Sequence, residues 1–262
     1  MQGSANLNLM KKAARKAGRS LVKDFREVEN LQVSSKGPGD FVSKADREAE
    51  RLIRDELMAG RPTYGFLGEE PGETEGADPT RRWIVDPLDG TTNFLHGLAH
   101  WAVSIALEHK GEIVSAVVYD AAKDEMYWAE KGGGAWMNES RLRVSGRRSM
   151  IEGIFATGVP FGGQGTLPAT LQDLARLMPV CAGVRRWGAA SLDLAYVAAG
   201  RYDGYWERGI KAWDIAAGML IVKEAGGFVS AIREGDEPLV KGSIICANEA
   251  LFEPFRKIIR GE

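Results

Sequence analysis

Trp83-Ile84-Val85-Asp86-Pro87-Leu88-Asp89-Gly90-Thr91-Thr92-Asn93-Phe94 is the most informative stretch of this sequence. The apolar run that ends at Val85 predicts a short strand. Pro87 fixes its own φ and predicts a tight turn directly after Asp86. A helix is expected to begin at Gly90-Thr91. This order of strand, turn and helix brings the carboxylates of Asp86 and Asp89 toward one point.

These two carboxylates suit a hard divalent cation. Mg²⁺ prefers carboxylate and water oxygens as ligands, whereas two close carboxylates without a cation repel, and one tends to take up a proton. Gly90 and Thr91 add backbone N–H groups at a helix start, where a phosphate binds favourably. The three histidines, His96, His100 and His109, are not at zinc-ligand spacing with any cysteine. Oxygen ligands and a phosphate are therefore predicted here.

Two further acidic positions stand out by their context. Glu69 follows a predicted strand and a glycine, and Asp214 precedes a predicted apolar helix. Each candidate also has a plainer interpretation. Asp214 alone is typical of a helix N-cap, Asp89-Gly90 of an ordinary turn, and Glu69-Glu70 of an acidic loop edge. The residues by themselves leave these alternatives open.

Helical and strand patterns interleave along the whole chain. Apolar spacing predicts helices over residues 7–28, 43–58, 167–178, 189–199, 214–225 and 249–259. Strands are predicted over residues 64–67, 82–85, 103–108, 113–119, 126–129, 135–137, 153–158, 202–206, 228–229 and 243–246. Residues 34–40 and 71–79 are predicted to be loops, and Gly132-Gly133-Gly134 a turn. Because hairpins and helices are both present, the fold class is α/β or α+β with mixed sheets.

A soft boundary lies near Leu142 to Met150, where Arg and Ser residues cluster. It predicts an N-terminal α+β subdomain, residues 1–145, that carries most of the acidic candidates. The C-terminal α/β subdomain, residues 146–262, would carry Asp214.

The composition is that of an ordinary globular protein. The 262 residues are 44% hydrophobic and 27% charged, with a formal net charge of −2. No global basic field would draw the chain to nucleic acid or to an anionic membrane. No apolar run reaches the roughly 18 residues of a membrane span, and the basic N-terminus lacks the apolar core of a signal peptide. Cys181 and Cys246 form no CxxC pattern, so reduced, packed thiols in a cytoplasmic protein are expected.

Several further motifs follow one another along the chain. They are Asp40-Phe41-Val42-Ser43-Lys44-Ala45-Asp46, Gly68-Glu69-Glu70, Arg186-Trp187-Gly188-Ala189-Ala190-Ser191, Asp203-Gly204-Tyr205-Trp206-Glu207, Trp213-Asp214-Ile215-Ala216-Ala217-Gly218 and Glu224-Ala225-Gly226-Gly227. Together with residues 83–94, these motifs resemble the inositol monophosphatase family over nearly the whole chain. The resemblance implies a layered αβαβα sandwich, dependence on Mg²⁺, inhibition by lithium and a homodimer.

The resemblance also implies roles for individual residues. Metal ligands would be Glu69, Asp86, the Leu88 carbonyl, Asp89 and Asp214. Gly90 and Thr91 would donate N–H groups to the phosphate, and Glu69, Thr91 and Asp46 would aim and activate the attacking water. Gly188, Ala189, Ala190, Glu207 and Asp214 would contact the substrate.

The substrate is less well defined than the chemistry. Inositol 1-phosphate and related sugar or polyol monophosphates are the leading prediction. Relatives with the same metal motif hydrolyse fructose 1,6-bisphosphate, 3′-phosphoadenosine 5′-phosphate, histidinol phosphate or NADP. Lys211 stands where animal members tend to carry histidine, and it is either a contact for a second negative group or a solvated lysine.

A role outside catalysis is a further hypothesis. Some bacterial members that resemble this chain act with RNA or the transcription machinery. Basic residues at 141–148 and at Arg185-Arg186 could form a patch for such a partner. Loops at a subdomain junction are the plainer interpretation of the same residues.

Overall fold

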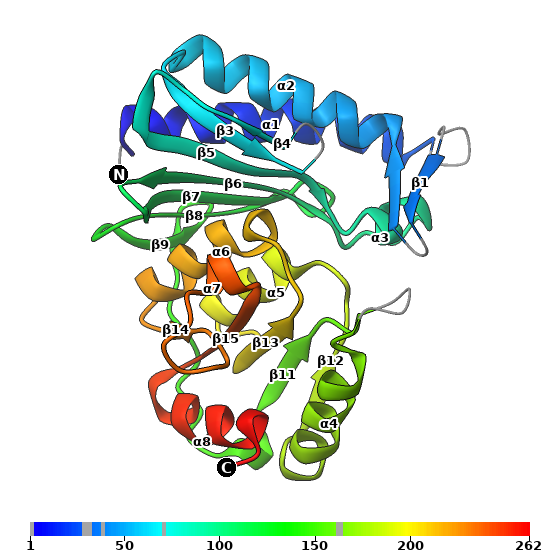
Figure 1. The fold of residues 1–262 in the computed structure, drawn as a ribbon, viewed down its shortest axis with the longest axis vertical. Helices are drawn as coiled ribbons and strands as arrows, with labels where there is room; N and C mark the ends of the chain where they lie inside the picture. Colours follow the sequence, from blue (N-terminus) through cyan, green and yellow to red (C-terminus); the bar gives the residue numbers. More distant parts are fainter. Residues whose placement is uncertain (1–2, 28–32, 38–39, 70–71, 161–164) are drawn as a thin grey trace.

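The computed structural model describes residues 3–27, 33–37, 40–69, 72–160 and 165–262. Its elements stack as five layers, helix, sheet, helix, sheet, helix, from the top to the bottom of Figure 1. The αβαβα prediction is confirmed.

The first layer is an antiparallel pair of amphipathic helices. α1 (Ala5–Phe25) and α2 (Lys44–Gly60) bury apolar side chains at helical spacing, among them Leu7, Leu21 and Ile53. Ser4 caps α1 by accepting from the N–H of Leu7. These two helices cover one face of the larger sheet (Figure 1).

The larger sheet has eight strands, in the order β10-β9-β8-β7-β6-β5-β3-β4. Only β3 and β5 pair in parallel. The strands are β3 (Tyr64–Gly68), β4 (Gly72–Thr74), β5 (Asp78–Asp89), β6 (Ala102–His109), β7 (Glu112–Asp120), β8 (Glu125–Glu130), β9 (Gly134–Met137) and β10 (Ser140–Arg141). The predicted hairpin at residues 109–111 and the glycine turn at 132–134 are both confirmed.

The middle layer is built from two helices that lie between the sheets. In α5 (Ala190–Ala198) and α6 (Ala212–Glu224) nearly every side chain is buried, as expected for helices that are apolar all round. Both helices pack into one apolar cluster with strands of both sheets. They bring the start of α6 and the start of α5 close to the end of β5 (Figure 1).

The smaller sheet and the last helices complete the stack. Its order is β12-β11-β13-β15-β14, with β11 parallel to both neighbours and the other pairs antiparallel. The strands are β11 (Ile154–Thr157), β12 (Gly183–Arg185), β13 (Gly204–Arg208), β14 (Phe228–Ser230) and β15 (Ser243–Ala247). Three further helices in this half of the chain are α4 (Leu167–Leu177), α7 (Pro238–Lys241) and α8 (Glu249–Arg260).

Two predicted loops are wrong in part. Ser34 to Gly37 lie in β1 (Val33–Gly37) and Asp40 begins β2 (Asp40–Ser43), which pairs antiparallel with β1, while residues 38 and 39 of this predicted loop lie outside the described residues. Residues 72–74, within the predicted loop 71–79, form the edge strand β4. Strands this short leave little hydrophobic alternation in the sequence, and their pairing depends on a partner strand that local patterns do not identify.

Other expectations can be compared directly with the described residues. Cys181 and Cys246 are both free and buried. The helices described here include none that is long and apolar enough to cross a membrane. The large sheet lies within residues 64–141 and the small sheet within 154–247. The division at residue 145 stays a prediction about independent subdomains.

Candidate active site

The end of β5 carries the first two carboxylates through a bulge rather than through a turn. β5 continues past Pro87, and its register against β6 shifts between Asp86 and Asp89. The predicted turn is therefore wrong in form, although the extra residue does bend the strand. Asp86 Oδ1 accepts from the N–H of Leu88 at 2.9 Å, which fixes this carboxyl against its own strand.

Gly90 makes the change from strand to helix possible. Its φ of +93° favours glycine, and a Cβ there would lie 2.9 Å from the carbonyl oxygen of His100. α3 (Thr91–Leu95) begins at the next residue, as predicted. Since α3 has only five residues, a phosphate at its start would depend on the individual N–H groups more than on a helix dipole.

The hydroxyl of Thr91 is held by two acceptors. Thr91 Oγ1 lies 3.0 Å from Asp46 Oδ1 on α2 and 3.0 Å from the carbonyl oxygen of Leu88. The Thr91 proton therefore points to one of these acceptors, and the oxygen keeps lone pairs that can accept from a water. Thr91 and Asp46, which lie 45 positions apart in sequence, are thus brought together, as the resemblance implied.

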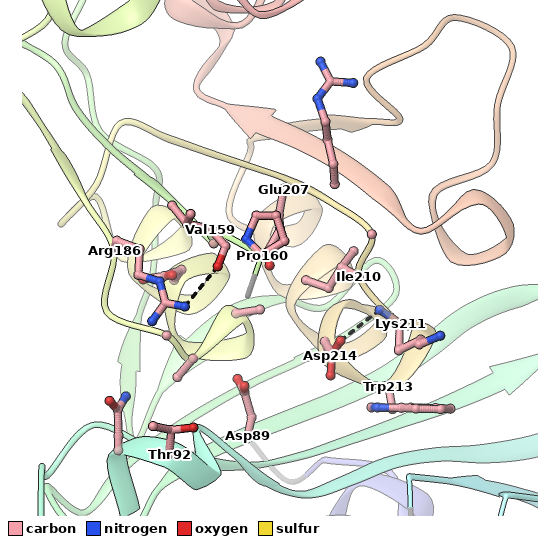
Figure 2. Close-up of a pocket in the computed structure, with 18 of the residues that line it drawn as sticks. Asp89, Thr92, Val159, Pro160, Arg186, Glu207, Ile210, Lys211, Trp213 and Asp214 are labelled. Atoms are coloured by element: carbon pink, nitrogen blue, oxygen red, sulfur yellow. Dashed lines mark hydrogen bonds between the residues drawn. The ribbon is translucent and has the colours of Figure 1, made fainter. Parts of the chain in front are cut away.

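Asp214 lies inside the first turn of α6 and is not its N-cap. The cap is Lys211, whose backbone N–H donates to Asp214 Oδ2 at 2.9 Å. The plain N-cap interpretation is therefore wrong. The hydrogen bond orients the carboxyl across the cavity from β5, as Figure 2 shows for Asp214 and Asp89.

The turn before α5 is tied to both β5 and α3. Ser191 donates to Asp89 Oδ2 twice, from its backbone N–H at 2.7 Å and from Oγ at 2.6 Å. Asn93 Nδ2 donates to the carbonyl oxygens of His100 at 2.8 Å and Trp187 at 2.7 Å. These bonds place Gly188 to Ala190 beside the phosphate-binding candidates, and a Cβ on Gly90 would lie 3.3 Å from that of Ala189.

Glu207 enters the same region from β13. Its carboxyl is hydrogen-bonded by the Tyr205 hydroxyl, and a Cβ on Gly158 would lie only 2.0 Å from Glu207 Oε1. Glycine at 158 is therefore what makes room for this carboxyl. Sequence reasoning placed Gly158 only at the end of a strand and missed this function.

These groups surround one cavity of about 660 Å³ (Figure 2). Of the predicted residues, its lining includes Glu69, Asp89, Gly188, Ala189, Ala190, Glu207 and Asp214. The predicted residues that are not part of this lining are Asp46, Asp86, Leu88, Gly90 and Thr91. Lining residues that the sequence did not assign to the site include Asn93, Val159, Pro160, Arg186, Asp193, Arg208 and Trp213. Glu70, next to Glu69, lies outside the described residues.

Burial and mutual repulsion disfavour negative charge in the cavity. Burial, followed by the charges of Glu69 and Asp89, raises the pKa of Asp86 well above its usual range. Burial, followed by the charge of Asp89, likewise raises the pKa of Asp214 well above its usual range. The pKa of Asp89 rises only to about 6, since the Ser191 hydrogen bonds oppose its burial. Burial also raises the pKa of Glu207 to about 7.

This donor set fits a hard divalent cation in its chemistry. Glu69, Asp86, Asp89 and Asp214 supply only oxygens, and their charges influence one another's pKa. In the part of the chain that the structure describes, no three His, Cys, Asp or Glu side chains lie together as a group that could hold a metal ion. Like charges resist closer approach, and a bound cation would lower that repulsion. The chemistry of the four carboxyls therefore suits a cation, whereas their spacing in this structure does not by itself form a metal site.

Comparison with known proteins places this geometry in a family. The profile described as the inositol monophosphatase family matches residues 5–260. The chain belongs to the inositol monophosphatase family. The family resemblance inferred from the motifs is thereby confirmed.

Individual relatives cover almost the whole chain. A protein of Rhizobium meliloti (strain 1021) named inositol-1-monophosphatase is 57% identical over 260 residues, which cover 99% of this chain and 98% of the relative. Escherichia coli (strain K12) has a relative named Nus factor SuhB, 43% identical over 256 residues, with 98% and 96% covered. The crystal structure of the extragenic suppressor protein suhB from Bartonella henselae superposes with a TM-score of 0.95 at 51% identity, covering 98% and 99%.

Proposed function

We propose that the protein hydrolyses inositol 1-phosphate and related polyol monophosphates to the alcohol and inorganic phosphate, with Mg²⁺ as its cofactor. The observation that carries the proposal is the single cavity that joins Glu69, Asp89 and Asp214 to Glu207 and the residue 188–190 turn. Membership of a metal-dependent family and the similarity to the Rhizobium meliloti enzyme support the same reaction.

Each group in the site has a distinct task under this proposal. Glu69, Asp86, the Leu88 carbonyl, Asp89 and Asp214 would hold Mg²⁺. When bound, Mg²⁺ supplies Lewis-acid stabilisation of the negative charge that develops on the phosphoryl and leaving oxygens. The remaining tasks, which are aiming water, holding phosphate and holding the polyol, belong to the protein.

Thr91 and Asp46 would position the attacking water. Thr91 would donate its hydroxyl hydrogen bond to Asp46 or to the Leu88 carbonyl, so that Thr91 Oγ1 can accept from the water and aim it in line with the ester bond. Glu69 would take the proton that the water loses. The N–H groups of Gly90 and Thr91 would hold the phosphate oxygens, while Gly188, Ala189, Ala190, Glu207 and Asp214 contact the polyol.

A panel of phosphate esters tests this function. Purified protein is assayed for phosphate release from inositol 1-phosphate, fructose 1,6-bisphosphate, 3′-phosphoadenosine 5′-phosphate, histidinol phosphate and NADP. Each assay is run with Mg²⁺, with Mg²⁺ and lithium, and with chelator. We expect inositol 1-phosphate to be the best substrate, with activity lost in chelator and inhibited by lithium. Turnover of another ester at least about a hundredfold faster, a difference of about 2.7 kcal/mol in activation free energy, would reject the substrate assignment.

A bisphosphate is the second candidate substrate, favoured by cationic side chains on the cavity lining. Of the three, Arg208 pairs with Asp173, whereas Lys211 and Arg186 could meet a second negative group (Figure 2). Lys211→Ala should then reduce kcat/KM for fructose 1,6-bisphosphate more than for inositol 1-phosphate. An equal effect on both esters would identify Lys211 as a solvated lysine.

The assembly and cellular setting of the enzyme are part of the proposal. We propose a homodimer, which the family resemblance implies, and a cytoplasmic location, which the two widely spaced cysteines without a CxxC pattern favour. Sedimentation velocity at several protein concentrations tests the homodimer. A molecular mass that stays at the 28.5 kDa of one chain at all concentrations would reject the dimer.

The transcription-related role stays a hypothesis. Its support is the name of the Escherichia coli relative and the basic residues at 141–148. Arg147, however, already pairs with the buried carboxyl of Asp203 at 3.3 Å. Recovery of RNA polymerase on immobilised wild-type protein, compared with an Arg147→Glu/Arg148→Glu variant, tests the patch. Equal recovery by both proteins would reject it.

A further inference from the structure

Asp193 is a buried carboxyl in a helix that is otherwise apolar on nearly every side. α5 buries eight of its residues, and Asp193 is among them at 1% exposure. Its Oδ1 has no hydrogen-bond partner among the described residues. An unpaired buried polar group destabilises a fold and calls for an explanation.

Other buried aspartates of the chain are well paired. Asp203 accepts from Ser145 Oγ, from Arg147 and from the N–H of Ile154. Asp173 accepts from the guanidinium groups of two arginines. A buried aspartate in this fold therefore finds partners where its role is structural, and Asp193 differs from that pattern.

The position of Asp193 suggests what it would bind. It lines the active-site cavity together with Glu207, which comes from β13. The charged groups that influence it are Glu207 and Asp89, both negative, and Arg186, which is positive. The Arg186 guanidinium donates to the carbonyl oxygen of Val159 at 3.1 Å (Figure 2). A hydrogen-bond partner for Asp193 would therefore have to come from a ligand bound in the cavity.

We propose that Asp193 binds a hydroxyl group of the substrate, so that Asp193 and Glu207 together recognise neighbouring hydroxyls of a polyol. The inference deepens the proposed function and rests on it. A phosphate ester without such hydroxyls would leave Asp193 unpartnered and would bind less well, which is how a polar site discriminates between substrates.

The electrostatics of the two carboxyls are compatible with this task. Burial, followed by the charge of Glu207, raises the pKa of Asp193 well above its usual range. In its protonated form the Asp193 carboxyl can donate to a substrate hydroxyl oxygen, and in its ionised form it can accept from the hydroxyl. Glu207 can then accept a hydrogen bond from the same substrate hydroxyl or from the neighbouring one.

The test combines ligand binding with stability. Asp193→Leu and Asp193→Asn are compared with wild type and with Asp203→Leu, a control at a buried and paired aspartate. Three quantities are measured: KM for inositol 1-phosphate, the competitive inhibition constant of inorganic phosphate, and Tm. Inorganic phosphate serves as the probe that carries no polyol hydroxyls.

We expect Asp193→Leu to raise KM about tenfold while the inhibition constant of phosphate changes less than about twofold. Its Tm should rise, because an unpaired buried carboxyl is replaced by an apolar side chain. Asp193→Asn should recover most of the KM, since an amide both donates and accepts. In contrast, Asp203→Leu should lower Tm and leave the ratio of the two constants unchanged.

Three outcomes would overturn the inference. They are a lower Tm for Asp193→Leu, a parallel rise of KM and of the phosphate inhibition constant, and an unchanged KM. Failure of the proposed function is a separate result, because wild-type protein would then not hydrolyse inositol 1-phosphate at all.

Discussion

Asp89 shows how much of this site depends on single hydrogen bonds. One oxygen of its carboxyl accepts two bonds from Ser191, which lies 102 residues further along the chain. The resemblance pointed to Asp89 itself from the sequence Asp-Gly-Thr-Thr that it begins. Ser191, Asn93 and Asp193 were not predicted as site residues, because the bonds that Ser191 and Asn93 make to Asp89 and Trp187 join segments distant in sequence, and Asp193 lies in an apolar helical run. The lone charge of Asp193 within an apolar helix was the signal that could have been used.

Replacement of Asp89 by asparagine should separate catalysis from folding. Asp89→Asn removes a ligand charge, so kcat should fall by more than about a hundredfold. The asparagine oxygen can still accept from Ser191, so the circular dichroism spectrum and Tm should be retained. Asp55→Asn, at an exposed ion pair with Arg51, is the matched control and should keep its activity. Wild-type turnover in Asp89→Asn would contradict the metal assignment.

Ser191 provides a test of metal binding that does not require turnover. Ser191→Ala loses the 2.6 Å bond from Oγ and keeps the backbone bond, so Asp89 is held less firmly. Affinity for Mg²⁺, measured by calorimetry on the protein without substrate, should fall by about tenfold. Ser191→Thr keeps the hydroxyl and should bind Mg²⁺ nearly as well as wild type. Equal affinities in all three proteins would remove Ser191 from the metal site.

At the scale of elements, long amphipathic helices were easy to predict and short strands were not. α1 and α2 have apolar stripes that identify them without any neighbour. β1, β2 and β4 are only three to five residues long, and each exists because another strand supplies its hydrogen bonds. The bulge at Pro87 escaped prediction for the same reason, since a bulge is defined only against the partner strand β6.

The C-terminal end of α6 has an anchor whose removal should affect stability. Glu224 accepts from the N–H groups of Gly132 and Gly134, each at 2.8 Å, and so ties α6 to the β8–β9 turn. Glu224→Ala should lower the free energy of unfolding by about 1–3 kcal/mol in urea titrations. Glu253→Ala, which breaks an exposed pair with Arg256, should change it by less than about 0.5 kcal/mol. Similar values for the two variants would show that the anchor contributes little.

At the scale of the whole molecule, the order of strands could not be predicted from local patterns. The alternation of predicted helices and strands indicated an α/β or α+β fold with mixed sheets. The αβαβα layers were predicted only through the family resemblance. β3 pairs with both β4 and β5, and β15 lies between β13 and β14. Such pairings depend on contacts between distant segments, which hydrophobic periodicity does not describe.

The pH dependence of global stability should contain a contribution from His100. This side chain is 6% exposed and packs against the rings of Trp187 and Tyr196. Burial lowers the pKa of His100 from 6.5 to about 4. The unfolded chain therefore binds the extra proton between pH 6.5 and 4, and stability is lost as pH falls through this window.

A variant isolates this contribution from that of the carboxyls. Wild type should lose up to about 3 kcal/mol more than His100→Gln between pH 7 and pH 4. Denaturant titrations at several pH values give both curves. Acidic groups with raised pKa values, such as Glu207, change stability in the opposite direction and are common to both proteins. Parallel curves would show that His100 is not buried as a neutral ring.

The buried middle layer has a consequence for how this enzyme can change. α5 and α6 have almost no surface free for substitution, and α6 carries Asp214 in its first turn. Asp193 apart, most substitutions of their buried side chains would harm folding before they could alter specificity. The cavity is otherwise bordered by connecting segments such as residues 158–160, 186–188 and 209–211. New substrates are therefore expected to arise through these segments and through position 193, while the rest of the central helices keeps the reaction itself constant across descendants.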